Sequence, residues 1–350
     1  QKKAAPGAKV MAIVKANAYG HGDIETARVF ESLGCLYFGV AIPEEGARLR
    51  HAGIKASIVV LGGVFPGQIK DMFDLDLTPV VFDLKTASLI AAHASKAGIV
   101  KKLHLKIDTG MGRLGATPDE AAPLARRIHE MGGLRIEGVM SHFSESESEV
   151  SAFTEEQLRA FNGALGAIKS ATGADPELIH MANSAAVVSH PESRFNLVRP
   201  GIMLYGSYPA PHLTDKIRLK PAMRIITKVL HVRNAPKGSP ISYGRRFVAS
   251  RDSIIAVLPI GYGDGYPRCL TGKADALIRG RRAPVAGAVC MDLIMCDVTG
   301  IPGVEAGDEA VILGPQEGTA VTAEELAGKA GTIPYEIFCG ISGRVPRIYV

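Results

Sequence analysis

The sequence predicts a (β/α)8 TIM-type barrel over residues 1–218, followed by a smaller, mostly β domain over residues 219–350. In the first part, eight short apolar runs alternate with segments that have helical spacing. These runs are apolar throughout, as expected for parallel strands that are covered on both faces. After about Leu219, helical spacing becomes rare, and short alternating strands separated by Gly/Pro-rich turns replace it.

The barrel strands are predicted from runs rich in β-branched and apolar residues. They are Val10–Ala16, Leu36–Ala41, Ser57–Val64, Thr78–Phe82, Leu103–Ile107, Ile136–Met140, Leu178–Met181 and Asn196–Val198. The clearest helical segments between them are Glu44–Arg50, Thr86–Ala97, Pro118–Met131 and Ser151–Ala171. Because strand–helix alternation requires right-handed parallel crossovers, eight such units close into a barrel. A doubly wound open sheet has the same alternation and is the alternative.

The second domain is predicted from shorter strands. They are Ile225–Val232, Ser253–Leu258, Asp275–Ile278, Ala283–Val289 and Glu309–Leu313, with one helix near Thr322–Gly331. Their length and the turn residues between them are typical of antiparallel sheets.

Composition narrows the classes of protein. A hydrophobic content of 47% with 21% charged residues is typical of a globular chain. The net charge of +5 is spread along the sequence without the basic stripe of a nucleic-acid binder. No apolar run is long enough to span a membrane. The five cysteines include no C-x-x-C pair, so we expect reduced thiols in a cytoplasmic protein and no metal site.

Polar or ionisable residues follow five of the predicted strands. They are Lys15, Lys106, His142, Asn183 with Ser184, and Arg199. Barrel enzymes carry their catalytic groups at these carboxyl ends of the strands. A lysine in apolar surroundings has a lowered pKa and becomes a nucleophilic amine, which is what an imine with a carbonyl compound requires. From the residue alone, a Lys15 that extends from the strand end to solvent is an equal alternative.

The loops after strands seven and eight frequently hold a phosphate in barrel enzymes. Here Ser184 supplies a hydroxyl, and Gly201 allows a backbone N–H to approach an anion closely. A phosphate site beside an imine-forming lysine suggests pyridoxal 5′-phosphate (PLP). Arg199 sharpens this hypothesis, because a permanently protonated guanidinium facing the pyridine nitrogen leaves that nitrogen unprotonated. The ring is then a weaker electron sink, which favours simple proton exchange at the substrate Cα.

The sequence resembles the alanine racemase family over nearly its whole length. The motifs that carry the resemblance are Val14–Gly22 (VKANAYGHG), Lys106–Gly115 (KIDTGMGRLG), Arg199–Ile202 (RPGI), Ser242–Gly244 (SYG), Gly261–Gly265 (GYGDG) and Val289–Asp292 (VCMD). The resemblance implies a PLP-dependent homodimer that interconverts L- and D-alanine. It also implies that D-alanine is supplied for peptidoglycan synthesis and that the active sites lie at the subunit interface.

The resemblance also implies roles for individual residues. Lys15 would bind the cofactor and act as one base, and Tyr243, supplied across the dimer interface, would be the opposing base. The remaining cofactor-binding set would be Tyr19, His142, Asn183, Ser184, Arg199, Gly201, Ile202 and Tyr335. Within it, Arg199 would meet the pyridine nitrogen, and His142 would connect Arg199 to Tyr243. Arg113, with the backbone of Met291 from the partner chain, would orient the substrate carboxylate. Lys106 matches a lysine that is often carboxylated and then positions Arg113.

Four other functions compete with this hypothesis. A broader amino-acid racemase acting on serine differs by one hydroxyl, which changes selectivity only modestly. A barrel-type PLP decarboxylase usually has an acidic residue at the ring nitrogen, which Arg199 disfavours. A PLP-binding protein without turnover would not need the domain that carries Tyr243. An aldolase that forms an imine directly would need no PLP.

Overall fold

The computed structural model describes residues 5–149 and 151–350. These residues form two compact units. The barrel unit holds the chain up to Ala18, Gly22–Leu204 and Tyr208–Arg218. The β unit holds Leu219–Val350 and two short segments from the earlier chain, Tyr19–His21 and Tyr205–Ser207.

The barrel unit contains the eight predicted strands. They are β1 (Lys9–Ile13), β2 (Tyr37–Val40), β3 (Ser57–Val60), β4 (Leu77–Val81), β5 (Lys101–Lys106), β6 (Leu134–Met140), β7 (Leu178–His180) and β8 (Leu197–Val198). The paired strands are parallel, in the order β7-β6-β5-β4-β3-β2-β1-β8. The ring closes between β7 and β8, where Arg199 N donates to Ala182 O (2.9 Å) and Asn196 Oδ1 accepts from Ile179 N (2.7 Å). The predicted barrel is confirmed, and the open-sheet alternative is wrong.

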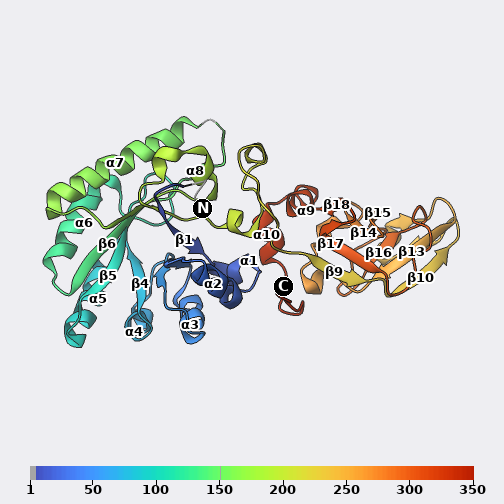
Figure 1. Ribbon diagram of the computed structural model, residues 1–350, viewed down its shortest axis with the longest axis horizontal. Helices are drawn as coiled ribbons and strands as arrows, with labels where there is room; N and C mark the ends of the chain where they lie inside the picture. Colours follow the sequence, from blue (N-terminus) through green and yellow to red (C-terminus); the bar gives the residue numbers. More distant parts are fainter. Residues whose placement is uncertain (1–4, 150) are drawn as a thin grey trace. The chain divides into compact units, whose positions relative to one another are not determined.

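Helices cover the outside of this barrel (Figure 1). They are α2 (Asp23–Ser32), α3 (Pro43–His51), α4 (Ile69–Asp74), α5 (Leu84–Ala97), α6 (Pro118–Glu130), α7 (Ala152–Thr172) and α8 (Ser184–Ser189). Their ends follow capping rules: Asp83 accepts from Thr86 N at the start of α5, and the left-handed Gly98 ends that helix. Short 3-10 turns at Pro66–Gln68, Pro191–Ser193, Ile202–Tyr205 and Pro211–Leu213 complete the connections.

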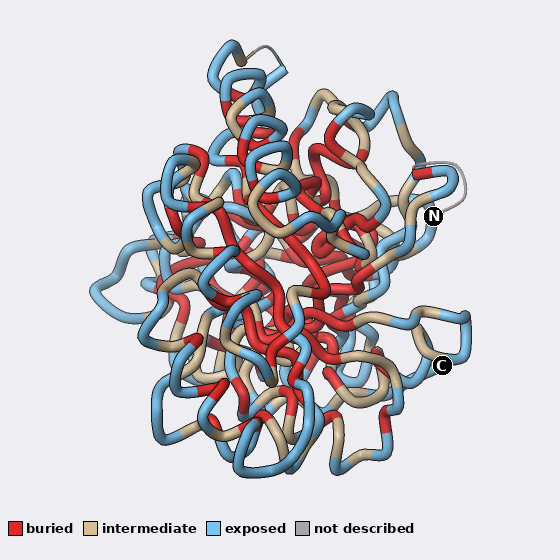
Figure 2. Tube along the Cα trace, turned by 90° about the vertical axis from the view of Figure 1, so that its left-hand side faces the viewer, coloured by how far each residue is buried: buried red, intermediate tan, exposed pale blue. Residues whose placement is uncertain are grey.

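The apolar runs of the sequence form the core. Met11, Phe38, Ile58, Leu77 and Leu103, one from each of the first five strands, have no exposed surface. Buried stretches run through the interior in Figure 2, and the exposed stretches are the outer loops and helix faces. The interior also contains polar exceptions, since His104, Glu137, His180 and Arg199 are all buried.

The β unit is built from ten short strands within the described residues. They are β9 (Ile225–Lys228), β10 (His231–Ala235), β11 (Pro240–Ile241), β12 (Phe247–Val248), β13 (Ser253–Leu258), β14 (Asp275–Ile278), β15 (Arg281–Pro284), β16 (Ile294–Asp297), β17 (Glu309–Gln316) and β18 (Thr319–Val321). Their pairing is antiparallel. Two helices, α9 (Ala323–Ala330) and α10 (Pro334–Cys339), and 3-10 turns at Tyr243–Arg245, Tyr262–Asp264 and Arg268–Leu270 accompany them.

Three predicted strands of this unit have different bounds, and one of them is β17, which runs to Gln316 and not to the predicted Leu313. The run Ile225–Val232 is divided, because β9 pairs with β17 whereas β10 pairs with β13. The run Ala283–Val289 forms a strand only at its start, since β15 covers Arg281–Pro284. Its register is set by a two-residue hairpin at Arg279 and Gly280, both with positive φ, which is the geometry of a type I′ turn.

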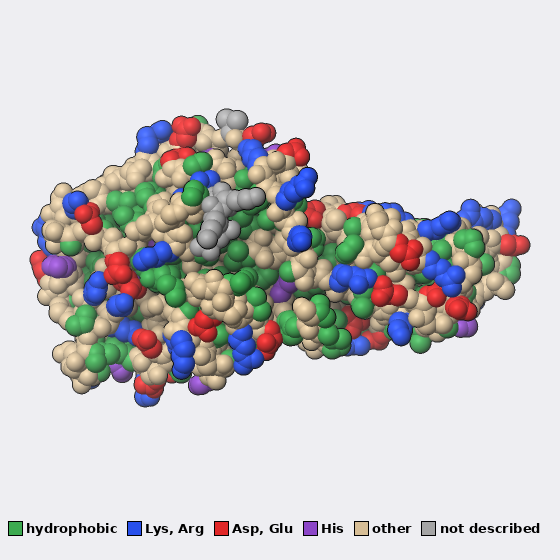
Figure 3. All heavy atoms as spheres, in the orientation of Figure 1, with side chains coloured by type: hydrophobic (Ala, Val, Ile, Leu, Met, Phe, Trp, Pro, Cys, Tyr) green, Lys and Arg blue, Asp and Glu red, His purple; other side chains and the backbone are tan. Residues whose placement is uncertain are grey.

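The surface carries charges of both signs. On the face shown in Figure 3, Lys and Arg lie interspersed with Asp and Glu. All five cysteines are free thiols. Among the described residues, no helix has the length and apolar character needed to cross a bilayer.

Candidate active site

The strand ends of the barrel unit bring several cationic groups together. Burial lowers the pKa of His142 well below its usual range, and the charges of Arg199, Arg113, Lys106 and Lys15 lower it further. Burial likewise lowers the pKa of Lys106 to about 8, with Arg199 and Arg113 adding to the effect. Such mutual influence requires short separations, so four of the predicted cations and His142 share the barrel mouth.

Lys15 begins a single left-handed turn. β1 ends at Ile13, three residues before the predicted end of that strand, and Val14 N adds one more ladder bond to Gly39 O (3.0 Å). Ala16, Asn17, Ala18 and Tyr19 then have φ values of 52, 54, 53 and 48°. Residues other than glycine rarely adopt this conformation, which costs roughly 1–2 kcal/mol per residue. Backbone strain of this kind persists only where the surroundings enforce it, and it is found at functional sites.

A carboxylate on α3 holds this turn. Glu45 Oε1 accepts from Ala16 N (2.7 Å), and Oε2 of the same carboxylate accepts from Ala41 N at the end of β2 (2.7 Å). Asn17 closes the other side, because its Oδ1 accepts from Asp23 N (3.0 Å). Asp23 also pairs with Arg48, one helical turn after Glu45. Two side chains of α3 therefore fix the segment that begins with Lys15.

Arg199 is buried, with 4% of its surface exposed. Its Nη1 lies 2.8 Å from His180 Nδ1 and donates to His180 O, and its Nη2 donates to Ser141 O and lies 3.1 Å from His142 Nδ1. Burial lowers the pKa of Arg199 to about 9, which leaves it charged near neutral pH. Among the described residues, its hydrogen bonds run through Nη1 and Nη2, and this leaves the Nε–H as a donor for a ring nitrogen.

Backbone donors converge next to Arg199. Gly201 N and Met203 N both donate to the hydroxyl of Ser184 (2.8 and 3.4 Å). Ile202 lies between these two donors, at the start of a 3-10 turn. Ser184 is the first residue of α8, and Asn183 caps that helix by accepting from Ala186 N (3.0 Å). The Ser184 oxygen is thus the acceptor for both N–H groups, and its O–H is the donor that can face an anion.

The loop that carries Arg113 is built around one carboxylate. Asp108 accepts hydrogen bonds from the N–H groups of Gly110 (2.9 Å), Gly112 (3.1 Å) and Arg113 (2.9 Å). Burial acts to raise the pKa of Asp108, but these donors outweigh it and hold the pKa below its usual range. The loop geometry thus depends on an ionised Asp108.

The remaining predicted residues belong to the β unit. Tyr19 contacts Tyr335 edge to face, with ring centroids 5.7 Å apart, and Tyr19 also contacts Tyr205 (5.2 Å). Tyr243 lies in a tight turn after Ser242, whose hydroxyl donates to Ala288 O (2.7 Å). Tyr243 is 73% exposed and Met291 is 52% exposed.

Sequence reasoning missed Glu45, Asp108, His104, Glu137 and His180 as supporting residues. Glu45 had a readable signal, since Pro43 is typical of a first helical turn and a glutamate two residues later can accept from the N–H before the helix, as Glu45 does from Ile42 N (3.4 Å). Asp108 lies within a recognised motif, but a loop around its carboxylate cannot be read from spacing. His104, Glu137 and His180 lie inside strands, where the pattern gave no reason to expect them to converge.

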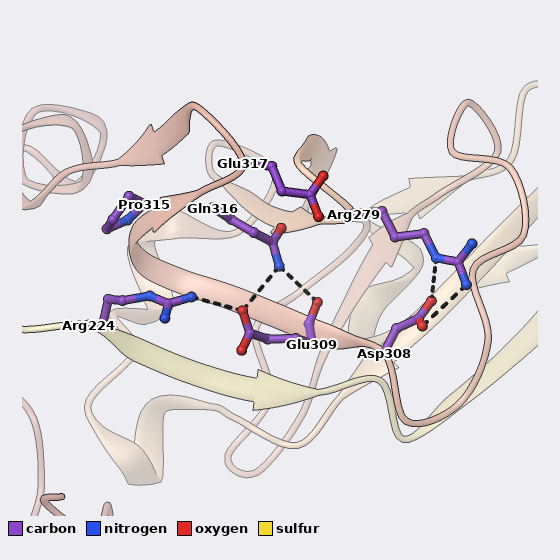
Figure 4. Close-up of a pocket in the computed structure, with 7 residues that line it drawn as sticks. All are labelled: Arg224, Arg279, Asp308, Glu309, Pro315, Gln316 and Glu317. Carbon is purple, nitrogen blue, oxygen red and sulfur yellow. Dashed lines mark hydrogen bonds and ion pairs between the residues drawn. The ribbon is translucent and has the colours of Figure 1, made fainter. Parts of the chain in front are cut away.

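Another hollow lies in the β unit, beside β17 (Figure 4). Its charged side chains are paired with one another: Arg224 with Glu309 (2.8 Å) and Arg279 with Asp308 (2.8 Å). Gln316 also donates to Glu309. These pairs satisfy each other on an exposed surface, so the hollow is a weaker candidate than the barrel mouth.

Comparison with known families agrees with the geometry of the barrel mouth. Residues 1–209 match the family model "Alanine racemase, N-terminal domain", and residues 222–349 match "Alanine racemase, C-terminal domain". The chain belongs to the alanine racemase family. It is therefore an isomerase that racemises alanine, and the predicted resemblance and enzyme class are confirmed.

Individual relatives span almost the full length. An alanine racemase of Halothermothrix orenii is 45% identical over 341 residues, covering 97% of this chain and 90% of the relative. One of Geobacter sulfurreducens is 45% identical over 98% of this chain and 91% of its own. Among solved structures, alanine racemase from Streptomyces lavendulae matches with a TM-score of 0.94 at 37% identity, covering 100% of this chain and 92% of the other. The alanine racemase of Bacillus anthracis with bound L-Ala-P matches with a TM-score of 0.92 at 34% identity, covering 100% and 90%.

Proposed function

We propose that this alanine racemase family member uses PLP and two bases, Lys15 and Tyr243, to exchange the Cα proton of alanine. The observation that carries the proposal is Arg199, a buried cation beside a cluster of converging N–H donors. An arginine held this firmly, with its Nε–H left over, suits a ring nitrogen that is to stay unprotonated.

The residues at the barrel mouth fit this cofactor. The N–H groups of Gly201 and Met203 both donate to the Ser184 hydroxyl oxygen, so these groups lie together, and the Ser184 O–H would donate to a phosphate placed there. Lys15 supplies the amine that would attach the cofactor covalently. PLP, when bound, withdraws electrons from the substrate Cα and so makes its proton acidic. Asn183 contributes by capping α8, and Tyr19 and Tyr335 would contact the phosphate.

His142 is suited to assist a phenolate base. Arg199 only donates hydrogen bonds, so His142 Nδ1, 3.1 Å from Nη2, must be the acceptor. The His142 proton then resides on Nε2, and burial with nearby cations keeps the ring neutral. A neutral Nε2–H can donate to the oxygen of Tyr243 and stabilise its deprotonated form. One base would remove the Cα proton from its own face, and the conjugate acid of the other base would deliver a proton to the opposite face.

We propose that the active unit is a homodimer. Tyr243 and the backbone of Met291 would come from the partner chain, and Arg113 would orient the substrate carboxylate. The exposure of the Tyr243 and Met291 side chains supports a surface that a second copy covers. We also propose that residues 1–218 and 219–350 are the functional domains, that the protein acts in the cytoplasm, and that its D-alanine is used for peptidoglycan.

A Tyr243→Phe variant tests the two-base mechanism. The equilibrium constant between enantiomers is one, so kcat/KM must fall equally in both directions and cannot separate the bases. Exchange of the Cα proton with D2O, followed by NMR on each pure enantiomer, does separate them. We expect racemisation to fall roughly 100- to 10,000-fold, with exchange retained for D-alanine and lost for L-alanine.

The wild-type protein and Lys15→Ala are the controls. The wild type should develop a visible absorbance band with PLP, and Lys15→Ala should not. Similar exchange losses for both enantiomers in Tyr243→Phe would contradict the assignment of the bases. Release of carbon dioxide would favour the decarboxylase instead, and equal rates with serine would favour the broader racemase.

A further inference from the structure

A column of buried polar side chains crosses the barrel interior behind Arg199. His180 Nδ1 lies 2.8 Å from Arg199 Nη1, and His180 Nε2 lies 2.8 Å from His104 Nδ1. His104 Nε2 lies 3.5 Å from Glu137 Oε2, a contact longer than an ordinary hydrogen bond. Both imidazole side chains are fully buried, and the Glu137 side chain is 4% exposed. The column therefore runs from the barrel mouth into the interior.

The far end of the column reaches solvent at the opposite end of the strands. Lys102, near the start of β5, donates from Nζ to Glu137 Oε1 (2.6 Å) and is half exposed. Glu137 is thus held between a surface cation and a buried imidazole. The contact with His104 lowers the pKa of Glu137 to about 2, against the effect of burial, and the bond from Lys102 adds to this. Glu137 is therefore ionised at neutral pH although it is buried.

Two features of β6 are needed to build this column. The register between β5 and β6 shifts after Leu103, which pairs with Ile136, so that His104 pairs with Gly138 and Glu137 is an extra residue. Such a bulge re-aims a side chain, here toward His104. At Gly138, a Cβ would lie 2.8 Å from His104 Nδ1, so only glycine leaves room for the imidazole. Barrel interiors are ordinarily filled by branched apolar residues, and polar groups there are costly.

The column has a fixed direction. Because Arg199 can only donate, His180 must accept at Nδ1 and carry its proton on Nε2. His180 then donates to His104 Nδ1, so that His104 also carries its proton on Nε2, facing the Glu137 carboxylate. Burial lowers the pKa of both histidines, which keeps the rings neutral. The N–H donors of Arg199, His180 and His104 in this column thus all point away from the barrel mouth and toward the Glu137 carboxylate.

Arg199 needs such a charge. Among the described residues, the groups that accept from it are neutral: the carbonyls of Ser141, His180 and Met181 and the rings of His142 and His180. A buried cation without a counter-charge is strongly destabilising. We propose that Glu137, which also pairs with Lys102, acts through His104 and His180 as the positioning residue that orients Arg199.

This proposal rests on the proposed function, because what Arg199 positions is the ring nitrogen of PLP. The two neutral imidazoles transmit the negative charge by polarising each other, as hydrogen bonds in a chain do in low dielectric. They also fix the guanidinium plane, since Nη1 is held by both Nδ1 and the carbonyl of His180. The Nε–H of Arg199 would then point toward the ring nitrogen, although no carboxylate pairs directly with Arg199 among the described residues of the barrel mouth.

The test compares Glu137→Gln with Glu177→Gln. Both substitutions remove one carboxylate next to the barrel strands. Glu177, however, lies on the surface: its side chain is 45% exposed and pairs with Arg135 of β6 at 2.8 Å. The first readout is ¹⁵N NMR of histidine-labelled apoprotein, which reports tautomers and N–H proton shifts without cofactor or turnover. The others are the PLP dissociation constant, kcat and KM of the reconstituted enzyme.

In Glu137→Gln we expect the Nε2–H proton of His180 to move upfield and its exchange with solvent to quicken. We expect kcat to fall and the PLP dissociation constant to rise, each by about tenfold, the factor that corresponds to about 1.4 kcal/mol, with KM for alanine little changed. Glu177→Gln should match the wild type in every readout. A merely structural Glu137 would lower stability but leave kcat, PLP affinity and the His180 resonance of the folded protein unchanged, and this result would overturn the proposal.

If Glu137→Gln does not fold, His104→Gln takes its place, with the same expected losses and the same refuting result. The apoprotein measurement also keeps this proposal separate from the proposed function. A wild-type protein that fails to bind PLP would overturn the function, whereas the histidine tautomers would still report whether the column exists.

Discussion

The left-handed turn after Lys15 predicts that one substitution has opposite effects at two positions. Ala16 has φ 52° and ψ 50° and is exposed, so Ala16→Gly removes little packing. Glycine relieves roughly 1–2 kcal/mol of left-handed strain, and its greater freedom in the unfolded chain costs about 0.4–1 kcal/mol. We expect a net stabilisation of about 0.5–1 kcal/mol. Ala92 is also exposed but lies inside the right-handed α5, where Ala→Gly costs about 1 kcal/mol.

Urea denaturation of the apoprotein measures both variants against the wild type. All three are compared at one protein concentration, because subunit association contributes to apparent stability. A shift in midpoint at constant m-value then gives the change in the free energy of unfolding. The N–H bond from residue 16 to Glu45 is retained in Ala16→Gly, so the comparison isolates the backbone. If Ala16→Gly destabilises the protein as much as Ala92→Gly, the strain argument is wrong.

Two further predictions concern the barrel mouth. Asp108→Asn weakens the acceptor for three N–H groups around Arg113, so KM for alanine should rise about tenfold while kcat changes little. The control is Asp119→Asn, which changes an exposed acid close in the sequence and should leave both constants unchanged. A loss confined to kcat in Asp108→Asn would contradict this role of Asp108. The lowered pKa of Lys106, about 8, leaves roughly a tenth of its amine unprotonated at pH 7, a share that grows as the pH rises through 8. Carbon-13 NMR with labelled bicarbonate should therefore show a carbamate signal that is absent in Lys106→Arg, and an identical spectrum for both proteins would exclude the modification.

The barrel could be predicted because its strands are covered on both faces. Continuous apolar runs such as Ser57–Val60 mark them, and the bounds of β13 and β14 in the second unit also agree with the sequence. The ends of the strands were harder to predict, because an apolar run in the sequence can continue beyond the residue at which the backbone leaves the strand. The predicted strand Val10–Ala16 is the clearest case: Val14 suits a strand, but the anchor that holds the turned chain, Glu45, lies 29 residues after Ala16.

The column of buried polar side chains could not be predicted either, because it also depends on residues that are distant in the sequence. Its members are single residues on β5, β6, β7 and after β8, and only closure of the barrel brings them together. The bulge that aims Glu137 inward leaves no sequence signal, because a one-residue shift of register looks like an ordinary strand. Gly138 is the exception, since an isolated glycine within a strand pattern indicates a bulge or a close approach.

The positive charges of the barrel mouth explain why supporting carboxylates lie behind it. Lys15, Lys106, Arg113 and Arg199 all act on His142, so the mouth is strongly cationic before any ligand binds. A phosphate of charge about −1.5 to −2 and a substrate carboxylate would balance that charge directly. Carboxylates at the mouth itself would compete with those ligands. Asp108 is instead occupied by backbone N–H groups, and Glu137 lies two imidazoles away from Arg199. The supporting carboxylates thus lie on the interior side of these cations, and the side of each cation that faces the barrel mouth can bind an anionic ligand.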